Sequence, residues 1–301
     1  MSKRTQGRPL RHLLALALLV MVATATYATE TPAERATDNG SNGGATLEIG
    51  IHPYLSARTV LTTYQPLQQY LQTQLQRPVL FITAPNFRTF VERTQRGEYR
   101  FVLTAPHFAR LAQREAGYLP MLRTKRDLHG VLVVNQDSPL QHVSELRGKT
   151  VATPDSIAII TMLGVQLLRA NDLKPGQDVV LRAMPSHDAA VLALQKGNGV
   201  AAAMVSATAL QQMPQELRDS IRTLATSNAV PPIMYLAHPK TPRREVADMT
   251  ALLLEFTENT PEGRKFISEI GHLGLRPPTT TEMKRLDPYV SDLKVLLRPA
   301  R

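Results

Sequence analysis

The chain contains no cysteine among its 301 residues. This absence excludes disulfide bonds, thiol nucleophiles, cysteine-ligated metals and a lipid attached to cysteine. The folded protein is therefore expected to depend on its hydrophobic core alone.

The common motifs of catalysis and nucleotide binding are also missing. There is no G-x-S-x-G elbow, Walker loop, Rossmann glycine fingerprint or HExxH pair. The 8 histidines include no pair spaced as HxH or at i and i+4, so we expect neither a metal nor another cofactor. No long block of like charges and no basic-aromatic stripe is present, which argues against nucleic acid as a partner. We predict that the protein is not an enzyme.

No apolar run is long enough for a membrane-spanning helix, which needs about 20 residues. The run from Leu13 to Ala23 follows a basic stretch and precedes small residues, an order typical of a secretory signal peptide. We predict a signal peptide at 1–28 that is cleaved near Ala25 or Ala28, a polar, flexible leader at 29–45, and export to the periplasm. An uncleaved membrane anchor is the alternative for this run. The formal charge of +10 falls to a mild +6 without the four signal-peptide cations, which are Lys3, Arg4, Arg8 and Arg11.

After the leader, short apolar runs alternate with longer amphipathic stretches. This pattern predicts βα units and an α/β fold with mainly parallel sheets. A helix over 58–76 carries a buried stripe at spacings of three and four that includes Val60, Tyr64 and Leu67. The expected strands are 47–51, 79–83, 101–103, 150–153, 179–184 and 200–205, and the expected helices are 58–76, 87–96, one from 106, 156–170, 188–196, 207–212, 245–259 and 261–271.

Two apolar segments are interpreted as crossings between lobes. The β-branched run 131–134 ends in a polar stop, and the proline-bounded run 231–238 returns the chain. The expected organisation has the first part of lobe 1 at 46–134, lobe 2 at 135–232, and a return segment with C-terminal helices of lobe 1 at 233–301.

The turns between strands and helices are the candidate binding elements, because ligands of open parallel sheets bind at the carboxyl ends of the strands. Capping of the helix start is an alternative role for Ser186 and Asp188, and a structural role remains open for His187. Ser186, His187 and Asp188 are adjacent, so they cannot assemble a catalytic triad. The candidate ligand-binding residues are Tyr54, Thr104, His107, Ser156, Ser186, His187 and Ser206.

Over about 47–290 the chain resembles the PhnD-like periplasmic phosphate, phosphite and phosphonate binding proteins of ABC transporters. This resemblance implies a two-lobed, type II-like binding-protein fold that closes about hinges near Asn135 and Tyr235. It also implies an oxyanion held by a tyrosine and a histidine, at the positions of Tyr54 and His187. The stretches that carry the resemblance are PYLSARTVLTTYQPLQQYL, FVLTAP, GVLVVNQDSPLQHVSELRGKTVA, SHDAAVLALQKGNGVAAAM and NTPEGRKFISEIG.

Three positions depart from the family pattern, and one of them is Arg100-Phe101, where an aspartate is common in relatives before the first-lobe turn. Many relatives place a Ser-Thr-Ser-like run where this chain has Pro154–Ala158, in which only Ser156 keeps a hydroxyl, and Ser206 stands where relatives often carry an aspartate. Asp155 could repel an anion or cap the helix, and the apolar run 157–160 could face an apolar ligand or lie in the core.

The resemblance implies the solute-binding component of an ABC importer, a monomer that captures a small oxyanion or related organic solute and delivers it to an inner-membrane permease. The alternative is a protein of the same fold that reports ligand occupancy to a membrane sensor kinase.

Overall fold

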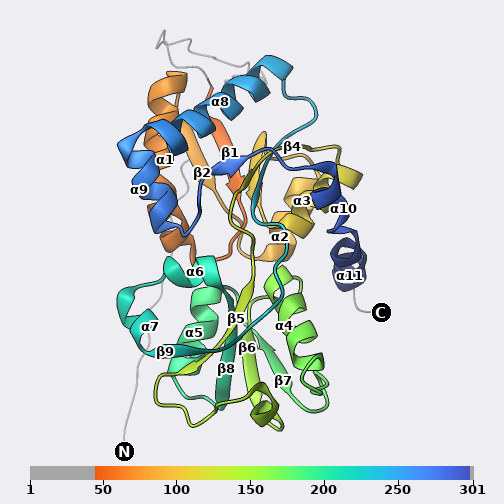
Figure 1. Ribbon diagram of the computed structural model, residues 1–301. Coiled ribbons are helices and arrows are strands. Elements are labelled where there is room, and N and C mark those ends of the chain that lie inside the picture. The colour runs from red at the N-terminus through yellow and green to blue at the C-terminus, as the bar shows by residue number, and fades with distance from the viewer. Residues whose placement is uncertain (1–44, 299–301) are drawn as a thin grey trace, which may run out of the picture. The chain divides into compact units, whose positions relative to one another are not determined.

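The computed structural model describes residues 45–298. The predicted signal peptide and nearly all of the predicted leader lie outside the described residues. Across 45–298, no helix combines the length and hydrophobicity needed to cross a bilayer. The described residues belong to one compact unit and contain two β-sheets, each flanked by helices (Figure 1). We call each sheet with its helices a lobe.

The first lobe contains a mixed sheet of order β11-β4-β10-β3-β1-β2. β1 pairs in parallel with β2 and β3, whereas β10 runs antiparallel to β3 and β4. Its strands are β1 (Leu47–Ile51), β2 (Val79–Ile82), β3 (Phe101–Thr104), β4 (Leu119–Thr124), β10 (Met234–Ala237) and β11 (Leu275–Arg276). Its helices are α1 (Ala57–Leu75), α2 (Phe87–Gln95), α3 (Pro106–Glu115), α8 (Arg243–Asn259), α9 (Pro261–Glu269), α10 (Thr280–Lys284) and α11 (Asp287–Leu297).

Alternating side chains of the first sheet pack into two separate cores. Phe101 and Leu103 of β3 join the cluster that contains α1, whereas Val102 between them joins the cluster that contains Phe90 of α2. This alternation is what a strand covered on both faces requires. The predicted stripe of α1 is confirmed, because Val60, Tyr64, Leu67 and Leu71 are its buried residues.

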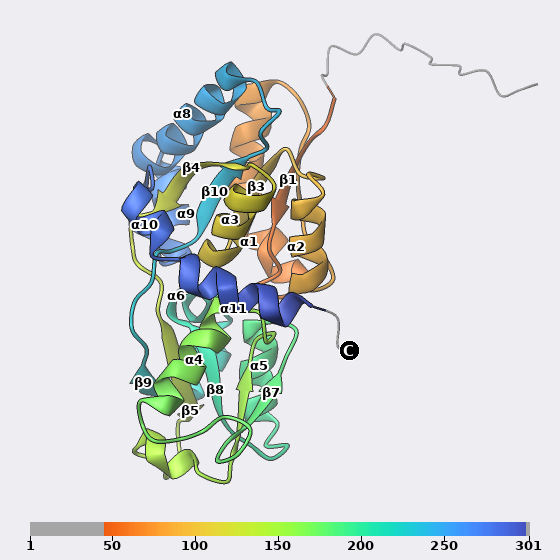
Figure 2. The same ribbon diagram turned by 90° about the vertical axis from the view of Figure 1, so that its right-hand side faces the viewer.

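The C-terminal helix α11 lies along α3 of the first lobe (Figure 2). The Arg110 guanidinium on α3 donates to the Asp287 carboxylate, with Nε at 2.8 Å from Oδ1. The side chain of Lys294 on α11 also pairs with Glu115 at the end of α3. The end of the described chain is therefore attached to the first lobe.

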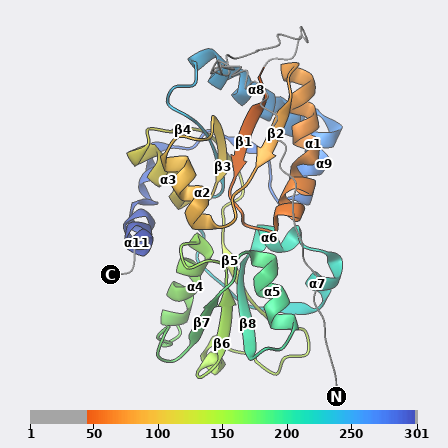
Figure 3. The same cartoon turned by 180° about the vertical axis from the view of Figure 1, so that it is seen from behind.

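The second lobe contains a mixed sheet of order β7-β6-β8-β5-β9, with α4 and α5 on either side of it (Figure 3). Along β5, Val131 and Val133 pack in the cluster that contains α5, whereas Leu132 and Val134 pack in the cluster that contains α4. The strands are β5 (Gly130–Asn135), β6 (Thr150–Thr153), β7 (Val180–Ala183), β8 (Val200–Ser206) and β9 (Ile221–Thr226). The helices are the 3-10 turn η1 (Val143–Leu146), α4 (Ile159–Arg169), α5 (His187–Gln195), α6 (Ala207–Gln211) and α7 (Gln215–Asp219).

The two sheets repeat one strand order, and each receives an antiparallel strand directly after a crossing. In the first sheet this strand is β10, and in the second it is β5. The crossings lie at 125–129 and 227–233, and they bond to each other where the Leu128 N–H donates to the Val230 carbonyl at 2.9 Å and the Val230 N–H donates back at 2.8 Å. This pair of bridged segments is the structural candidate for a hinge.

Several details differ from the sequence-based expectations. The strands β4, β5, β9, β10 and β11 were not among the expected strands. Gly130–Asn135 lie in the second sheet, so the first crossing precedes the expected boundary at 135 and the hinge expected near Asn135. Both sheets are mixed rather than mainly parallel, because β5 and β10 enter them antiparallel. Helix α4 begins at Ile159 and not at 156, because the Asp155 carboxylate accepts the Ile157 N–H at 3.0 Å and favours a turn there.

Candidate ligand-binding site

One small cavity lies where the strand ends of the two lobes meet. Its walls come from the loops that follow β1 and β3, from the first turns of α4 and α5, and from the end of β8. Its volume is about 20 Å³, which is room for about one water molecule. The lining residues are His52, Tyr54, Phe87, Ala105, Leu128, Ala158, Ile159, Ile160, His187, Ser206, Thr208 and Ile233.

Three of the candidate binding residues line this cavity: Tyr54 from the first lobe, and His187 and Ser206 from the second. His187 is the first residue of α5, and Ser206 ends β8 and caps α6. Both positions follow from the strand-to-helix turns seen in the sequence. The structure therefore brings these three side chains together.

The other four candidates lie outside the cavity lining. Thr104 is fully buried at the end of β3, and its hydroxyl has no partner among the described residues. Ser156 is exposed in the turn before α4. The Ser186 hydroxyl caps α5 by accepting the Ala189 N–H at 3.4 Å, which is the alternative role considered for it. His107 lies beside the cavity in a contact between the lobes.

Several lining residues were not among the candidates. His52, Phe87 and Thr208 lie in the strand-to-helix turns that the sequence analysis chose as candidate binding elements. Their position in these turns is the only feature of the sequence that could have identified them. Leu128 and Ile233 lie on the two crossings. Their burial in a shared cavity depends on how the crossings pack, which no local pattern in the sequence indicates.

The first turn of α5 is bonded directly to the loop that follows β1. The His187 N–H donates to the Tyr54 carbonyl at 3.0 Å. Nearby, the Ser56 N–H donates to Asp188 Oδ2 at 3.2 Å. N–H groups at a helix start are the donors that bind anions in many proteins. Here one such donor, the His187 N–H, is used to close the two lobes on each other.

Further side-chain bonds join the lobes. His107 Nε2 lies 2.7 Å from the Ile157 carbonyl oxygen, so this nitrogen carries the proton and donates. The Tyr54 hydroxyl donates to Gln212 Oε1 at 2.6 Å. Burial raises the pKa of Tyr54 well above its ordinary value, so its hydroxyl stays a neutral donor. The lobes are thus joined by neutral groups and one carboxylate.

Two buried histidines line the cavity, His52 from the first lobe and His187 from the second. One offers a hydrogen-bond acceptor and the other a donor. Burial lowers the pKa of both His52 and His187 to about 3, so both rings are neutral near pH 7. His187 Nδ1 accepts the Ser206 N–H at 3.3 Å, which leaves the proton on Nε2 as a donor. His52 Nδ1 donates to the Leu103 carbonyl at 3.4 Å, which leaves Nε2 as an acceptor.

The cavity lining carries no formal charge near neutral pH. The adjacent Asp188 carboxylate accepts the Ser56 and Ala189 N–H groups and the Ser186 hydroxyl, so its oxygens are occupied. The rest of the lining is largely hydrophobic, with Phe87 from the first lobe and Ile159 and Ile160 from the second. The arrangement offers one imidazole donor, one imidazole acceptor and small hydroxyls inside apolar walls.

Comparison with known proteins places this geometry in a family. The family model described as "ABC transporter, phosphonate, periplasmic substrate-binding protein" matches residues 49–283. PhnD1 from Prochlorococcus marinus, solved in complex with methylphosphonate, superposes with a TM-score of 0.72 at 11% identity, over 83% of this chain and 98% of that one. A binding protein component of an ABC phosphonate transporter from Pseudomonas aeruginosa superposes with a TM-score of 0.71 at 12% identity, over 84% of this chain and 89% of that one.

A curated relative belongs to a different functional class. The tetrathionate sensor histidine kinase TtrS of Salmonella typhimurium is 28% identical over 181 residues, which cover 57% of this chain. The match spans 31% of the kinase, so it concerns only part of that protein. The family match covers far more of this chain, and with the shared two-lobed fold it leads to one conclusion. The chain belongs to the family of periplasmic substrate-binding proteins of ABC phosphonate transporters.

Proposed function

We propose that the protein captures a small oxyanion or related organic solute between its lobes, for delivery to an inner-membrane ABC permease, and that it catalyses no reaction. The convergence of Tyr54, His187 and Ser206 from two lobes on one cavity carries this proposal. Ligand bound between them would contact both lobes and so favour the closed arrangement over an open one. A ligand larger than one water molecule would hold the lobes slightly further apart than they lie here.

The chemistry of the cavity favours a singly charged or protonated solute with an apolar part. The Nε2–H of His187 can donate to an oxyanion oxygen, and Nε2 of His52 can accept from a hydroxyl of the same ligand. No lysine or arginine lines the cavity, so a doubly charged anion would lose its hydration without a compensating cation. The apolar walls at Ile159 and Ile160 suit an alkyl group. A monoprotonated alkylphosphonate or an alkylsulfonate fits this description better than the phosphate dianion.

The match to part of a sensor kinase favours one second candidate. In this alternative the same cavity binds a solute, and the protein reports occupancy to a membrane kinase. Cross-linking the protein to its neighbours in native membranes separates the two candidates. Recovery of a permease supports import, whereas recovery of a kinase without a permease supports sensing.

The test of ligand capture is thermal unfolding of residues 29–301 with a panel of solutes. The panel contains methylphosphonate, longer alkylphosphonates, alkylsulfonates, phosphite, phosphate and tetrathionate. A solute at about 100 times its dissociation constant stabilises the protein by about 2.7 kcal/mol and raises the unfolding midpoint. The absence of any shift across the panel would contradict the proposal.

A variant of His187 ties the shift to the cavity. In His187→Asn the amide oxygen can still accept the Ser206 N–H, but the donor at Nε2 is lost. We expect affinity for the stabilising solute to fall by about tenfold or more. The matched control is His142→Asn, because His142 is exposed on the second lobe away from the cavity lining.

A further inference from the structure

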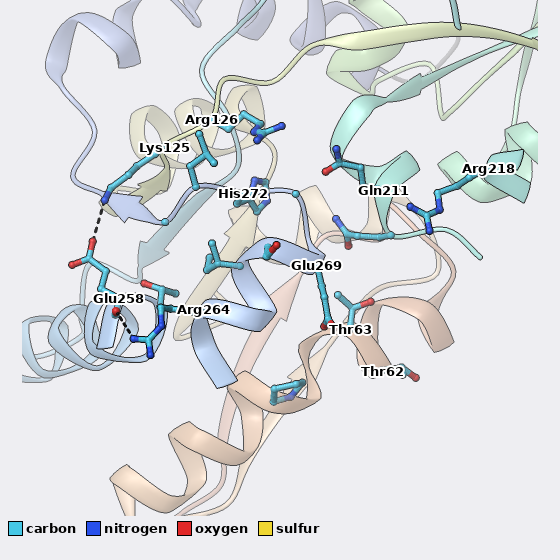
Figure 4. A pocket seen from close by; sticks show the side chains of 18 residues that line it. Thr62, Thr63, Lys125, Arg126, Gln211, Arg218, Glu258, Arg264, Glu269 and His272 are labelled. Atoms are coloured by element: carbon cyan, nitrogen blue, oxygen red, sulfur yellow. Dashed lines mark hydrogen bonds and ion pairs between the residues drawn. The ribbon is translucent and has the colours of Figure 1, made fainter. Parts of the chain in front are cut away.

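A second and much larger hollow lies outside the cavity described above (Figure 4). It has a volume of about 1210 Å³. Helices α1, α8 and α9 of the first lobe form much of its wall, together with Lys125 and Arg126 at the first crossing. The second lobe contributes Gln211, Gln212 and Arg218. We call this hollow the basic cleft.

Unpaired positive charge distinguishes the basic cleft. Four cationic side chains and only two carboxylates line it, and Lys125 pairs with one of these, Glu258, at 3.1 Å. Among residues 45–298 its three arginines have no carboxylate partner. Arg218 donates to the amide oxygen of Gln215, Arg264 donates to a backbone carbonyl at 3.1 Å, and Arg126 has no hydrogen bond within the described chain.

A buried histidine between these cations also lacks a partner. His272 is only 4% exposed, and neither of its ring nitrogens has a hydrogen-bond partner among the described residues. Buried side-chain nitrogens in proteins are nearly always bonded. Burial, with Arg126 nearby, lowers the pKa of His272 to about 4, so the neutral ring offers one donor and one acceptor. Both ring nitrogens are themselves buried, so the groups that a ligand in the cleft could reach are the three arginines, which carboxylate oxygens would satisfy.

The shape of the basic cleft favours a polypeptide over a small anion. Its volume exceeds the roughly 300–1,000 Å³ of typical small-molecule sites. Figure 4 shows Arg218 on one side and Lys125 and Arg264 on the other, with His272 between them. Leu273 at the lining is 61% exposed and offers an apolar contact beside the cations. An extended segment with carboxylates spaced along it can meet both sides, whereas one small anion cannot.

We propose that the basic cleft binds an acidic polypeptide segment of a partner protein. This inference rests on the proposed function, which requires a membrane partner. Both lobes line the cleft, so a segment lying in it would contact both. Gln212 connects the two sites, because its Nε2 lies 3.4 Å from the Ile270 carbonyl at the cleft and its Oε1 accepts the Tyr54 hydroxyl at the cavity. Docking at the cleft is therefore coupled to lobe closure.

The test uses a fluorescein-labelled hexaglutamate peptide with an amidated C-terminus, titrated with residues 29–301 and followed by fluorescence anisotropy. We expect saturable binding that weakens as salt is added, and no binding of a hexaglutamine peptide. The triple variant Arg126→Gln, Arg218→Gln and Arg264→Gln should bind hexaglutamate about tenfold more weakly.

The matched control is the triple variant Arg169→Gln, Arg243→Gln and Arg285→Gln, which removes the same charge from exposed positions. This control variant should bind hexaglutamate with an affinity within about twofold of that of the unmodified protein. Equal losses in the two triple variants would overturn the proposal, as would the absence of hexaglutamate binding. Displacement of the peptide by citrate at equal carboxylate concentration would also overturn it, in favour of a site for small polyanions. Solute-induced thermal shifts are measured separately, so failure here is distinguishable from failure of ligand capture.

Discussion

The two lobes share one strand order but are packed with different side chains. Every phenylalanine and tyrosine of the described residues lies outside 130–226, so the second lobe contains none. In the first lobe, aromatic rings pack against one another. The ring centroid of Phe256 lies 5.6 Å from that of Phe266 and 4.9 Å from that of Tyr70. The second lobe fills the equivalent volume with leucine, isoleucine, valine and methionine. The same topology thus tolerates different side chains, provided that both faces of each sheet are apolar and filled.

The same contrast appears at the cavity. The first lobe contributes rings, from His52, Tyr54 and Phe87. The second lobe contributes small hydroxyls, such as Ser206, and the start of two helices, with His187 as its single ring. A ligand held between them would meet a flat, ring-bearing wall on one side and a hydroxyl-bearing wall on the other.

The largest expected effect tests whether the lobes unfold together. Leu194 of α5 is almost fully buried in a cluster that also contains residues of the first lobe. Leu194→Ala should lower the free energy of unfolding by about 3–5 kcal/mol. Because the second lobe has no tyrosine, tyrosine fluorescence of residues 29–301 reports the first lobe alone, while far-ultraviolet circular dichroism reports both. We expect both signals to shift to the same lower denaturant midpoint. A shift in circular dichroism with an unchanged tyrosine midpoint would mean that the lobes unfold separately.

The second prediction compares the ion pairs of the lobes. Arg123 of the first lobe is 2% exposed and pairs with Asp127 at 2.6 Å and with Glu282. Replacing it with methionine leaves these carboxylates without their buried cation, so Arg123→Met should cost about 3 kcal/mol. Arg147 of the second lobe pairs with Asp178 but is 56% exposed, so Arg147→Met should cost no more than about 1 kcal/mol. Urea denaturation measures both costs, and similar values for the two variants would remove the contrast.

Local patterns predicted most elements but not the partners of their strands. The stripe of α1 is encoded in its own sequence, and so is the Thr260 cap and Pro261 start of α9. The run 131–134 was interpreted from the sequence as a crossing between lobes, but it forms most of β5. Its place in the second sheet depends on pairing with β8 and β9, which lie tens of residues further along the chain. Such pairing is set by the packing of the whole fold, so no local signal identified the crossing at 125–129.

The candidate site was predictable in outline for the same reason. Strand-to-helix turns are local, and three of the residues chosen from them, Tyr54, His187 and Ser206, line the cavity. That they bind a ligand stays a prediction. Whether a residue in such a turn faces the cavity depends on one or two dihedral angles. Ser156 is exposed because the Asp155 turn delays the start of α4. The basic cleft had no sequence signature, because its arginines are far apart in the chain.

The third prediction concerns how the free energy of unfolding changes as the pH is lowered. The pKa values of His52 and His187 fall to about 3 in the folded protein, below the ordinary value of 6.5. The unfolded chain therefore binds more protons between these values, and the free energy of unfolding falls as the pH decreases below about 6.5. Between pH 6.5 and pH 5 the free energy of unfolding should therefore fall by about 2 kcal/mol less in His187→Asn than in the unmodified protein. Urea denaturation at each pH tests this, with His142→Asn as control. An unchanged slope in His187→Asn would contradict the buried, neutral state of the ring.

The smallest effect concerns the bond between the ring-bearing lobe and the hydroxyl-bearing lobe. Tyr54→Phe removes the hydroxyl that donates to Gln212 and should cost about 1 kcal/mol. Tyr118→Phe is the matched control, because its hydroxyl donates to the Tyr99 carbonyl at 2.7 Å within the first lobe. Both variants lose a bond of the same kind, but only Tyr54→Phe weakens the closed arrangement. Small-angle scattering should therefore show a larger radius of gyration for Tyr54→Phe alone. Equal radii would mean that the other contacts, above all the His187 N–H on the Tyr54 carbonyl, hold the lobes together without the hydroxyl.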